Sequence, residues 1–545
     1  MNVVSRKRGR AILFIFSFIF IIWGLTFIYK SSFIAIDGKR YFSLFDDAMI
    51  SMRYAWNFSH GFGLIWNHGE YVQGYTNLLM TLLMSFSTFI FNKSVAVLFI
   101  QIVGVGLILA IAYVNMLIAN YVVVGQREST RIFIGIISFC CAFAYYPLVY
   151  WTLMGMETGL LTLLLLLGIL FAFRYVESKK PLHLFWMSGI LGLAFLTRND
   201  SAIFAMIVWV YIVWETLVPI SKFNIKKLQH LLAAIVLFAT FTIGQLMFQY
   251  LYYGAILPNT YILKLTGMPL TARVANGLRF VTPFLKTINF MFILSSLEVV
   301  FNFQKKKLLL ISIVFFAVGY EVYVGGDPWN YWRIMSPSMP FLTMLFVIAV
   351  DATIFALSNT QAFRLFFLRK PILPEKYVNK IMTVSLILLG LLLANLQFFR
   401  EILFFDEPYT VVANKRNVNR AIALGQLTTE DATIGVTWAG STPYYVDRKA
   451  IDFLGKSDQH IAKLQPDLSG AVGWLGMNSV PGHNKYDLNY SIKKLRPTYV
   501  PSFKYGTQDL SEWAKDKYVR VEYGGVELFL LKDSPYVYWN KIDIP

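Results

Sequence analysis

The chain has 545 residues, of which 57% are hydrophobic and only 15% are charged. Soluble domains carry about 25% charged residues, so this composition excludes an ordinary soluble enzyme and indicates a polytopic membrane protein. The formal net charge of +18 is typical of a membrane protein whose cytoplasmic loops are basic, and we expect no nucleic-acid partner. Cys140 and Cys141 are adjacent in an apolar run, which excludes a disulfide framework and a zinc site.

The first apolar run, residues 11–29, follows the basic residues Arg6, Lys7, Arg8 and Arg10. It is longer than the apolar core of a signal peptide and long enough to cross a hydrocarbon layer of roughly 30 Å. We therefore expect a retained anchor whose start lies in the cytoplasm. Ten further spans are expected at 95–124, 132–150, 158–176, 182–197, 202–220, 229–252, 278–303, 308–324, 336–357 and 381–399.

One more run, Thr76 to Phe91, decides the orientation of every later span. If it crosses the membrane, the basic loops fall outside; if it lies along the surface, they fall in the cytoplasm, as the positive-inside rule requires. We therefore expect an interfacial helix over 76–91 and eleven spans in all. The basic residues behind this inference are Arg127, Arg131, Lys179, Lys180, Lys222, Lys226, Lys227, Lys305, Lys306, Lys307, Arg364, Arg369, Lys370, Lys376 and Lys380.

These inferences define a protein of two parts. Residues 1–400 form an α-helical membrane domain with about eleven transmembrane helices and a long exterior loop over 30–93. Residues 401–545 form an exterior soluble α/β domain, because short β-like runs are mixed there with polar, helix-compatible stretches. The expected strands are 433–437, 498–503, 519–523 and 527–531, and the expected helices are 414–426 and 457–463.

The first exterior loop is crowded with polar and aromatic residues. Asp46 and Asp47 stand side by side and are followed by the candidate substrate-binding residues Arg53, Tyr75 and Asn77, among tryptophans, other tyrosines and glycines. An acid pair is often merely solvated, but aromatic rings and glycine turns suit packing around a polar ligand at the interface. A partly buried carboxylate in such a place is a candidate general base.

Metal binding in this loop has less support. His60, His68 and Glu70 match no strong ligand template, and such histidines more often hydrogen-bond their own loop. We expect no required cofactor, although a divalent cation held by Asp46 and Asp47 stays open.

The other exterior loops also carry polar residues near the ends of spans. Charges at span ends are commonly interface anchors, so each one alone is more often structural. Collected on one face, they supply cations and acids over an aromatic bed, which suits holding a phosphorylated lipid and reacting its head group. Arginine offers phosphate bidentate contacts, and lysine offers a point charge. The candidate substrate-binding residues here are Glu157, Arg198, Asp200, Asn259, Tyr261, Lys264, Asp327 and Arg333.

Together these motifs resemble those of the GT-C glycosyltransferases, integral-membrane enzymes that use polyprenyl-phosphate sugars. Within that superfamily the chain is similar to the family of the mycobacterial terminal β-(1→2)-arabinofuranosyltransferases, over nearly its whole length. The matching segments are DDAMISMRYAWNFSHGFGLIWNHGEYVQGYTN at 46–77, GMETGL at 155–160, LTRND at 196–200, LPNTYILK at 257–264, VGGDPWNYWRIMSP at 324–337, IDFLGKSDQHIA at 451–462 and PGHNKYD at 481–487.

The resemblance implies an inverting transfer of a sugar, such as a pentofuranose, from a polyprenyl-phosphate donor to a cell-envelope glycan or glycolipid. It gives the role of general base to Asp46, with Asp47 as the second candidate. The implied place is the bacterial cytoplasmic (inner) membrane, where the protein contacts membrane lipids. Its N-terminus would be cytoplasmic and its C-terminal domain exterior.

The same resemblance implies roles for cations and for the C-terminal domain. Arg198, Lys264 and Arg333 would stabilise the departing phosphate without a metal. His483 and Lys485 would contact the acceptor, in a domain that does not itself carry the base. A structural turn is an equally good interpretation of the Pro-Gly motif that contains them.

Two other classes of protein compete with this enzyme. A transporter or flippase of lipid-linked sugars would place ionisable groups at mid-membrane and show internal repeats, whereas the expected spans are nearly free of charge. An exterior sugar-binding or signalling domain on an inert anchor would not need eleven spans. The loops between the spans would then be featureless, and they are not.

Overall fold

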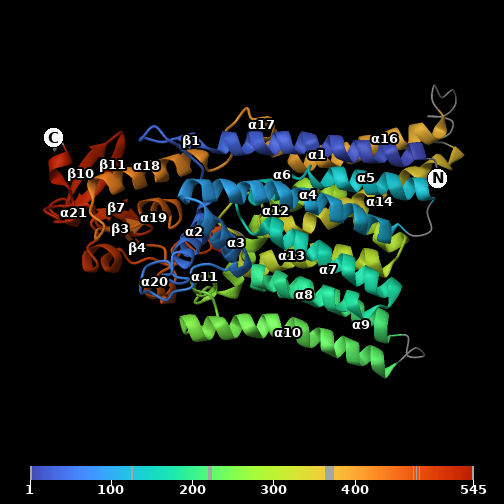
Figure 1. Ribbon diagram of the computed structural model, residues 1–545, viewed down its shortest axis with the longest axis horizontal. Helices are drawn as coiled ribbons and strands as arrows, with labels where there is room; N and C mark the ends of the chain where they lie inside the picture. Colours follow the sequence, from blue (N-terminus) through green and yellow to red (C-terminus); the bar gives the residue numbers. More distant parts are fainter. Residues whose placement is uncertain are drawn as a thin grey trace.

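The computed structural model describes residues 3–123, 127–218, 224–361, 374–470, 472–473, 476–477 and 479–542. Four basic residues used in the topology inference, Lys222, Arg364, Arg369 and Lys370, lie outside the described residues. The long helices run side by side along the longest axis of the molecule, with the N-terminus at one end and the C-terminal domain at the other (Figure 1).

The helical part confirms the predicted fold class of a polytopic helical membrane protein. Among the described residues, nine helices are long and apolar enough to cross a bilayer, or ten if a bent pair counts as one span. The remaining expected span is α8 (Pro181–Thr197), whose 17 residues rise about 25 Å. The other helices of the bundle are α1 (Val3–Ser31), α4 (Lys93–Val122), α5 (Glu128–Ala142), α6 (Tyr146–Leu153), α7 (Thr158–Ser178), α9 (Ala202–Leu217), α10 (Ile225–Tyr253), α12 (Leu270–Phe301), α13 (Lys305–Val324), α14 (Met339–Ser358) and α16 (Glu375–Asn395).

One predicted span is broken in two. The run expected as a single helix over 132–150 forms α5 and α6, which are bent by 54°. Pro147 lies in the first turn of α6, where its missing N–H costs no hydrogen bond. Asn395 bridges the break, because its amide donates to Ala144 O at 2.7 Å and its oxygen accepts from the Tyr146 N–H at 2.8 Å. These backbone polar groups at the break are therefore hydrogen-bonded within the protein, as irregular backbone in a membrane domain must be.

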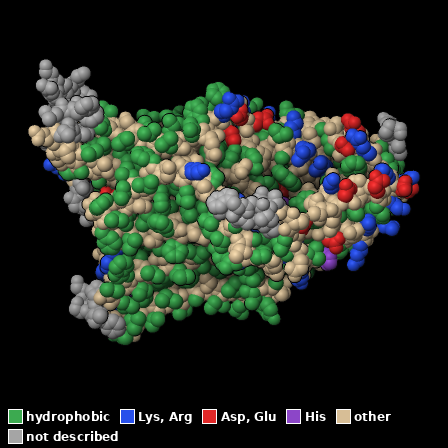
Figure 2. Space-filling view, turned by 180° about the vertical axis from the view of Figure 1, so that it is seen from behind, with side chains coloured by type: hydrophobic (Ala, Val, Ile, Leu, Met, Phe, Trp, Pro, Cys, Tyr) green, Lys and Arg blue, Asp and Glu red, His purple; other side chains and the backbone are tan. Residues whose placement is uncertain are grey.

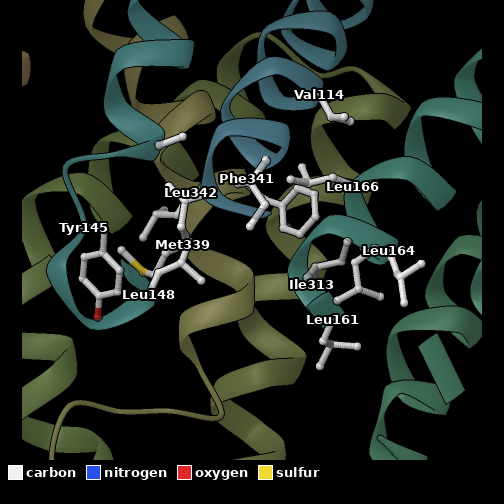
Figure 3. Close-up of a cluster of buried hydrophobic side chains, with 14 of the residues drawn as sticks. Val114, Tyr145, Leu148, Leu161, Leu164, Leu166, Ile313, Met339, Phe341 and Leu342 are labelled. Carbon is white, nitrogen blue, oxygen red and sulfur yellow. The ribbon is translucent and has the colours of Figure 1, made fainter. Parts of the chain in front are cut away.

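A continuous apolar core surrounds α14. Every side chain from Met339 to Val350 is buried, which is typical of a helix at the centre of a bundle. Figure 3 shows Phe341 of α14 among side chains from the neighbouring helices, including Val114, Leu166 and Ile313. This packing fixes the positions of the helix ends, and thereby of the polar residues in the loops that join them.

A β-hairpin and three short helices lie at the end of the bundle next to the C-terminal domain (Figure 1). The helix expected over 76–91 is present as α3, and its 13 residues rise about 20 Å, less than the thickness of a hydrocarbon layer. It packs on α2 and α4. The elements are β1 (Phe33–Ile34), β2 (Arg40–Tyr41), α2 (Asp46–Ser59), α3 (Leu78–Ile90) and α11 (Asn259–Leu265).

The C-terminal domain contains a five-stranded mixed sheet in the order β10-β11-β7-β3-β4. Strand β3 pairs in parallel with β4 and β7, while β11 pairs antiparallel with β7 and β10. The four predicted strands and both predicted helices are present, and β4 is an addition. The elements are α17 (Phe399–Ile402), α18 (Val411–Leu427), β3 (Thr433–Val436), α19 (Ser441–Val446), β4 (Lys449–Asp452), α20 (Gln459–Lys463), β5 (Val472–Gly473), β6 (Gly476–Met477), β7 (Tyr499–Val500), β8 (Lys504–Tyr505), β9 (Gln508–Asp509), α21 (Ser511–Ala514), β10 (Tyr518–Tyr523) and β11 (Val526–Leu531).

The two parts differ in the chemistry of their surfaces. Figure 2 shows apolar side chains covering the helical bundle, while lysine, arginine, aspartate and glutamate gather over the C-terminal domain. A bundle surrounded by lipid and a domain surrounded by water require this division.

Candidate active site

A cavity of about 350 Å³ lies where the helical bundle meets the C-terminal domain. Its walls come from α2, α11, the turns before α7 and α9, the segment between α13 and α14, and two loops of the C-terminal domain. The predicted site residues that line it are Asp47, Tyr75, Asn77, Glu157, Arg198, Asp200, Tyr261, Lys264, Arg333 and His483.

Asp47 faces this cavity from the first turn of α2 and is held between two cations. Its carboxylate accepts from the Arg333 guanidinium, with 2.9 Å between Nη1 and Oδ2, and from the Lys456 ammonium. Burial opposes ionisation of Asp47, but the two cations outweigh it and hold the pKa of the carboxyl well below its usual range. Asp47 is therefore a fixed negative charge and a weak proton acceptor.

Arg333 reaches the cavity through a strained turn. The preceding residues Tyr331 and Trp332 have φ angles of +70° and +47°, a backbone region that costs non-glycine residues about 1–3 kcal/mol each. Asp327, buried behind the turn, accepts from Arg333 Nε at 3.0 Å. The guanidinium is thereby held between Asp327 and Asp47, so that one arginine orients two carboxylates.

A second ion-pair network lines the cavity at the starts of α7 and α9. Arg198 donates to Glu157 Oε1 at 2.9 Å and to the two oxygens of Asp200 at 2.9 and 2.5 Å. Asn77 donates to the other Glu157 oxygen at 3.0 Å. Since Asp47 is paired as well, every acid that lines the cavity within the described ranges is paired with a cation.

Lys264 differs from the other cations of the cavity, because its ammonium has no hydrogen-bond or ion-pair partner among the described residues. Its stem lies against Gly482, where an added Cβ would come within 3.3 Å of Lys264 Cγ and Cε. Burial lowers the pKa of this amine, because the charged form has lost its hydration. A nearby anion would compensate for the lost hydration, so Lys264 is suited to a negatively charged ligand.

His483 enters the cavity from the C-terminal domain. Its Nδ1 lies 3.2 Å from Pro481 O, and since a carbonyl oxygen only accepts, Nδ1 carries the proton. Burial, and next the charge of Lys456, lower the pKa of the ring to about 4, so the imidazole is neutral at physiological pH. Nε2 is then an unprotonated nitrogen, and the described part of the chain gives it no hydrogen-bond partner.

Asp46, the residue expected to act as the base, does not line the cavity. It is 3% exposed, and its two oxygens accept from the backbone N–H groups of Gly440 and Ser441 at 3.1 and 3.0 Å. The carboxylate thus caps the start of α19 and joins α2 to the C-terminal domain. Asp47 points elsewhere because consecutive residues of a helix are about 100° apart. The geometry therefore favours Asp47, the second candidate, as the acid that faces the cavity.

The burial of Asp46, which outweighs the effect of its two capping hydrogen bonds, predicts a pH-dependent stability. Burial raises the pKa of its carboxyl from 3.8 to about 6, so the folded protein binds this proton more tightly than the unfolded chain. The free energy of unfolding should then fall by about 3 kcal/mol as the pH rises through the window between these two values. Asp46→Asn should remove this component, seen as the difference in unfolding free energy between wild type and variant from pH 4 to about pH 7. If the unfolding free energies of the two proteins vary with pH in parallel, the pKa of Asp46 is not raised in the folded protein.

Gly440 makes the close approach to Asp46 possible. An added Cβ would lie 2.1 Å from Asp46 O and 2.8 Å from Asp46 Oδ1. We therefore expect Gly440→Ala to lower the free energy of unfolding by about 1–3 kcal/mol, as overpacking does. Gly425→Ala, within α18, is the control, because an added Cβ there meets nothing within 4 Å and alanine favours the helix by up to about 1 kcal/mol. Equal unfolding midpoints for the two variants would argue against a tight contact at Gly440.

Besides Asp46, four predicted site residues lie outside the lining of the cavity: Arg53, Asn259, Asp327 and Lys485. Lys485 is 1% exposed and donates to the carbonyls of Ile262 and Ala462, which ties α11 to α20. Arg53 joins the loop before α3 to the C-terminal domain by donating to Trp66 O, Pro443 O, Asn67 Oδ1 and Arg448 O. The expectation of direct substrate contact does not fit Arg53 or Lys485, because protein oxygens already take up their donors.

Lys456 lines the cavity and pairs with Asp47, and the sequence pattern did not single it out. It lies 409 positions after Asp47, and no local spacing connects the two residues. The loop that carries it is fixed on both sides: Asp452 accepts from the Ser457 N–H at 2.8 Å, and Asn259 donates to Lys456 O at 3.1 Å. Asn259 therefore acts on the cavity indirectly, by positioning the partner of Asp47.

The described residues contain no group of three or more histidine, cysteine, aspartate or glutamate side chains arranged to hold a metal ion. His60 and His68 stack on Trp56 and Phe62 instead, with ring centroids 3.9 and 4.0 Å apart. The oxygens of the acid pair at the start of α2 are engaged by backbone amides and by cations. The pair does not fit a divalent cation in this arrangement.

Comparison with known proteins bears on the fold. A family model described as Domain of unknown function (DUF8728) matches residues 409–536, and no curated protein matches the sequence significantly. The oligosaccharyltransferase AglB from Archaeoglobus fulgidus, in complex with an inhibitory peptide and a dolichol-phosphate, has 11% identity and a TM-score of 0.52, covering 98% of this chain and 75% of that one. The apo form gives 10% identity and a TM-score of 0.53, with 98% and 76% covered. This chain has the GT-C fold.

At such low identity the GT-C likeness establishes the fold alone. ArnT from Cupriavidus metallidurans, in the apo state, is 13% identical with a TM-score of 0.46 over 80% of this chain and 84% of that one, which is too low to carry an argument. The narrower likeness to arabinofuranosyltransferases stays a hypothesis. The activity has to be inferred from the residues of the cavity.

Proposed function

We propose that this protein transfers a sugar from a polyprenyl-phosphate donor to a hydroxyl of a cell-envelope glycan or glycolipid, on the exterior face of the membrane. The observation that carries the proposal is Lys264, whose ammonium has no partner among the described residues, in a cavity whose other cations each have a carboxylate partner. A phosphate bound there would give the Lys264 ammonium the hydrogen-bond partner that the described residues do not supply.

The lipid part of the donor is supported by the surface beside the cavity. Leu257 and Tyr261 line the cavity and are also 46% and 42% exposed, next to the exposed Ile256. An acyl or prenyl chain can run from the cavity onto this apolar surface. The archaeal oligosaccharyltransferase that shares the fold is in complex with a dolichol-phosphate, and we extend that type of ligand to this chain.

The proposed chemistry is a single displacement that inverts the anomeric centre. An acceptor hydroxyl attacks the anomeric carbon while the polyprenyl phosphate departs on the opposite side. Lys264, with Arg333 and Arg198 in the same cavity, would stabilise the departing phosphate. Asp47 would hold Arg333 and Lys456 in place as a permanent anion. If the likeness to arabinofuranosyltransferases holds, the transferred sugar is a pentofuranose.

Lipid binding tests the proposal without knowledge of the sugar. Purified protein in detergent is titrated with a synthetic polyprenyl phosphate and, separately, with the polyprenol of the same length. We expect the phosphate lipid to raise the unfolding temperature and the alcohol to have much less effect, because a ligand stabilises the state that it binds. Equal effects of the two lipids would contradict a phosphate site at Lys264.

A further inference from the structure

The proposed transfer needs a proton acceptor for the attacking hydroxyl, and none of the acids that line the cavity in the described part of the chain is free to serve. Asp47 bridges Arg333 and Lys456, and the Glu157 and Asp200 carboxylates are held by Arg198. Each of these acids is an ion-pair partner whose lone pairs point at cations. A group that already stabilises a cation in this way is a poor general base.

His483 is the side chain of the cavity that meets the requirement. Its Nδ1–H is committed to Pro481 O, which orients the ring and fixes the tautomer. Nε2 carries an unshared lone pair and has no hydrogen-bond partner in the described ranges, and the residue lines the cavity. Trp329 lies edge-on to the imidazole, with 6.0 Å between the ring centroids, and further limits its orientation.

We propose that Nε2 of His483 accepts the proton of the acceptor hydroxyl. The inference rests on the proposed function and adds a catalytic residue to it. The O–H bond breaks, and its proton moves to Nε2. The oxygen forms a bond to the anomeric carbon, and the bond from that carbon to the phosphate oxygen breaks, so that the electron pair leaves with the polyprenyl phosphate. The imidazolium then returns its proton to water.

The charges around His483 couple this step to donor binding. The charged groups that act on the ring are Lys456 and Lys264, which disfavour its protonation, and Asp47, which favours it. A donor phosphate bound at Lys264 adds a negative charge beside the imidazole, and so raises its affinity for a proton. His483 becomes a stronger base only when the donor is present. This role also revises the expectation that the C-terminal domain carries no base.

Replacement of His483 tests the inference in the full-length protein. We expect His483→Ala and His483→Gln to lower transfer by about 10²- to 10⁴-fold, with binding of polyprenyl phosphate and the unfolding temperature close to wild type. Added imidazole should restore part of the activity of His483→Ala. His460→Ala is the matched control, because His460 lies on the exposed side of α20 with 47% of its side chain accessible, and it should transfer normally.

The outcomes separate this inference from the proposed function. Transfer by His483→Ala within about threefold of wild type would overturn the role of His483 and leave the proposed function intact. A large loss that imidazole does not rescue, accompanied by weaker phosphate-lipid binding, would also overturn it and indicate a positioning role. Failure of the wild-type protein to transfer sugar from any polyprenyl-phosphate donor would overturn both.

Discussion

Asp47→Asn should abolish transfer and destabilise the protein together. Asp47 is the common partner of Arg333 and Lys456, whose side chains are 6% and 15% exposed. Asparagine is nearly isosteric but leaves Lys456 without its ion-pair partner and Arg333 with Asp327 alone, and breaking a buried ion pair in this way costs about 3–5 kcal/mol. Denaturant unfolding measures the loss, and Asp516→Asn, at an exposed acid of the same protein, is the control that should stay within about 0.5 kcal/mol of wild type.

A double-mutant cycle shows whether the loss comes from the ion pair. Lys456→Gln removes the cation that Asp47→Asn leaves without an ion-pair partner, so the double variant Asp47→Asn/Lys456→Gln should be more stable than the sum of the single losses predicts. We expect a coupling energy of at least about 1 kcal/mol between these positions. Additive losses would mean that Asp47 and Lys456 do not interact in the folded protein.

Lys264→Glu should have the next largest effect, on donor affinity. The change removes a charge-assisted hydrogen bond to phosphate, worth about 1.5–3 kcal/mol, and adds repulsion of similar size. The affinity for polyprenyl phosphate should fall by about 10²- to 10⁴-fold, whereas Lys264→Arg should keep most of it. Titrations of the unfolding temperature with the lipid give the measurement.

The control for this change is Lys463→Glu, at an exposed lysine of α20. It alters the net charge of the protein by the same amount without touching the cavity. If Lys463→Glu weakens lipid binding as much as Lys264→Glu does, the attraction is a long-range effect of net charge. Undiminished binding by Lys264→Glu would place the lipid phosphate elsewhere.

Most of the fold could be predicted because membrane spans are local signals. An apolar run of about 20 residues identifies a helix without knowledge of its neighbours, and each of the eleven expected runs coincides with described helix. The break between α5 and α6 was not predicted, since it depends on Asn395, which is 251 residues from Ala144. Strand β4 has only four residues, too few for an alternation to stand out.

The cavity was predictable as a set of loops on one face, but not in its internal assignments. Asp46 and Asp47 are equivalent in the sequence, and only the helical phase of α2 and the arrival of Gly440 separate the capping acid from the cavity acid. Lys456 was not predicted because its partner, Asp47, is 409 positions away in the sequence. Long polar side chains such as Arg53 are equally suited to a ligand and to protein carbonyls, and the surrounding fold decides between them.

Sugar transfer from a polyprenyl-phosphate donor can be measured with the purified protein. Radiolabelled polyprenyl-phosphate pentofuranoses and hexoses are supplied with envelope glycans of the source organism, to wild type and to Asp47→Asn. We expect label on the glycan and equimolar release of polyprenyl phosphate with wild type, and neither with the variant. If the labelled donor stays intact with every sugar, and wild-type protein in vesicles moves it across the bilayer, the protein is a transporter and not a glycosyltransferase.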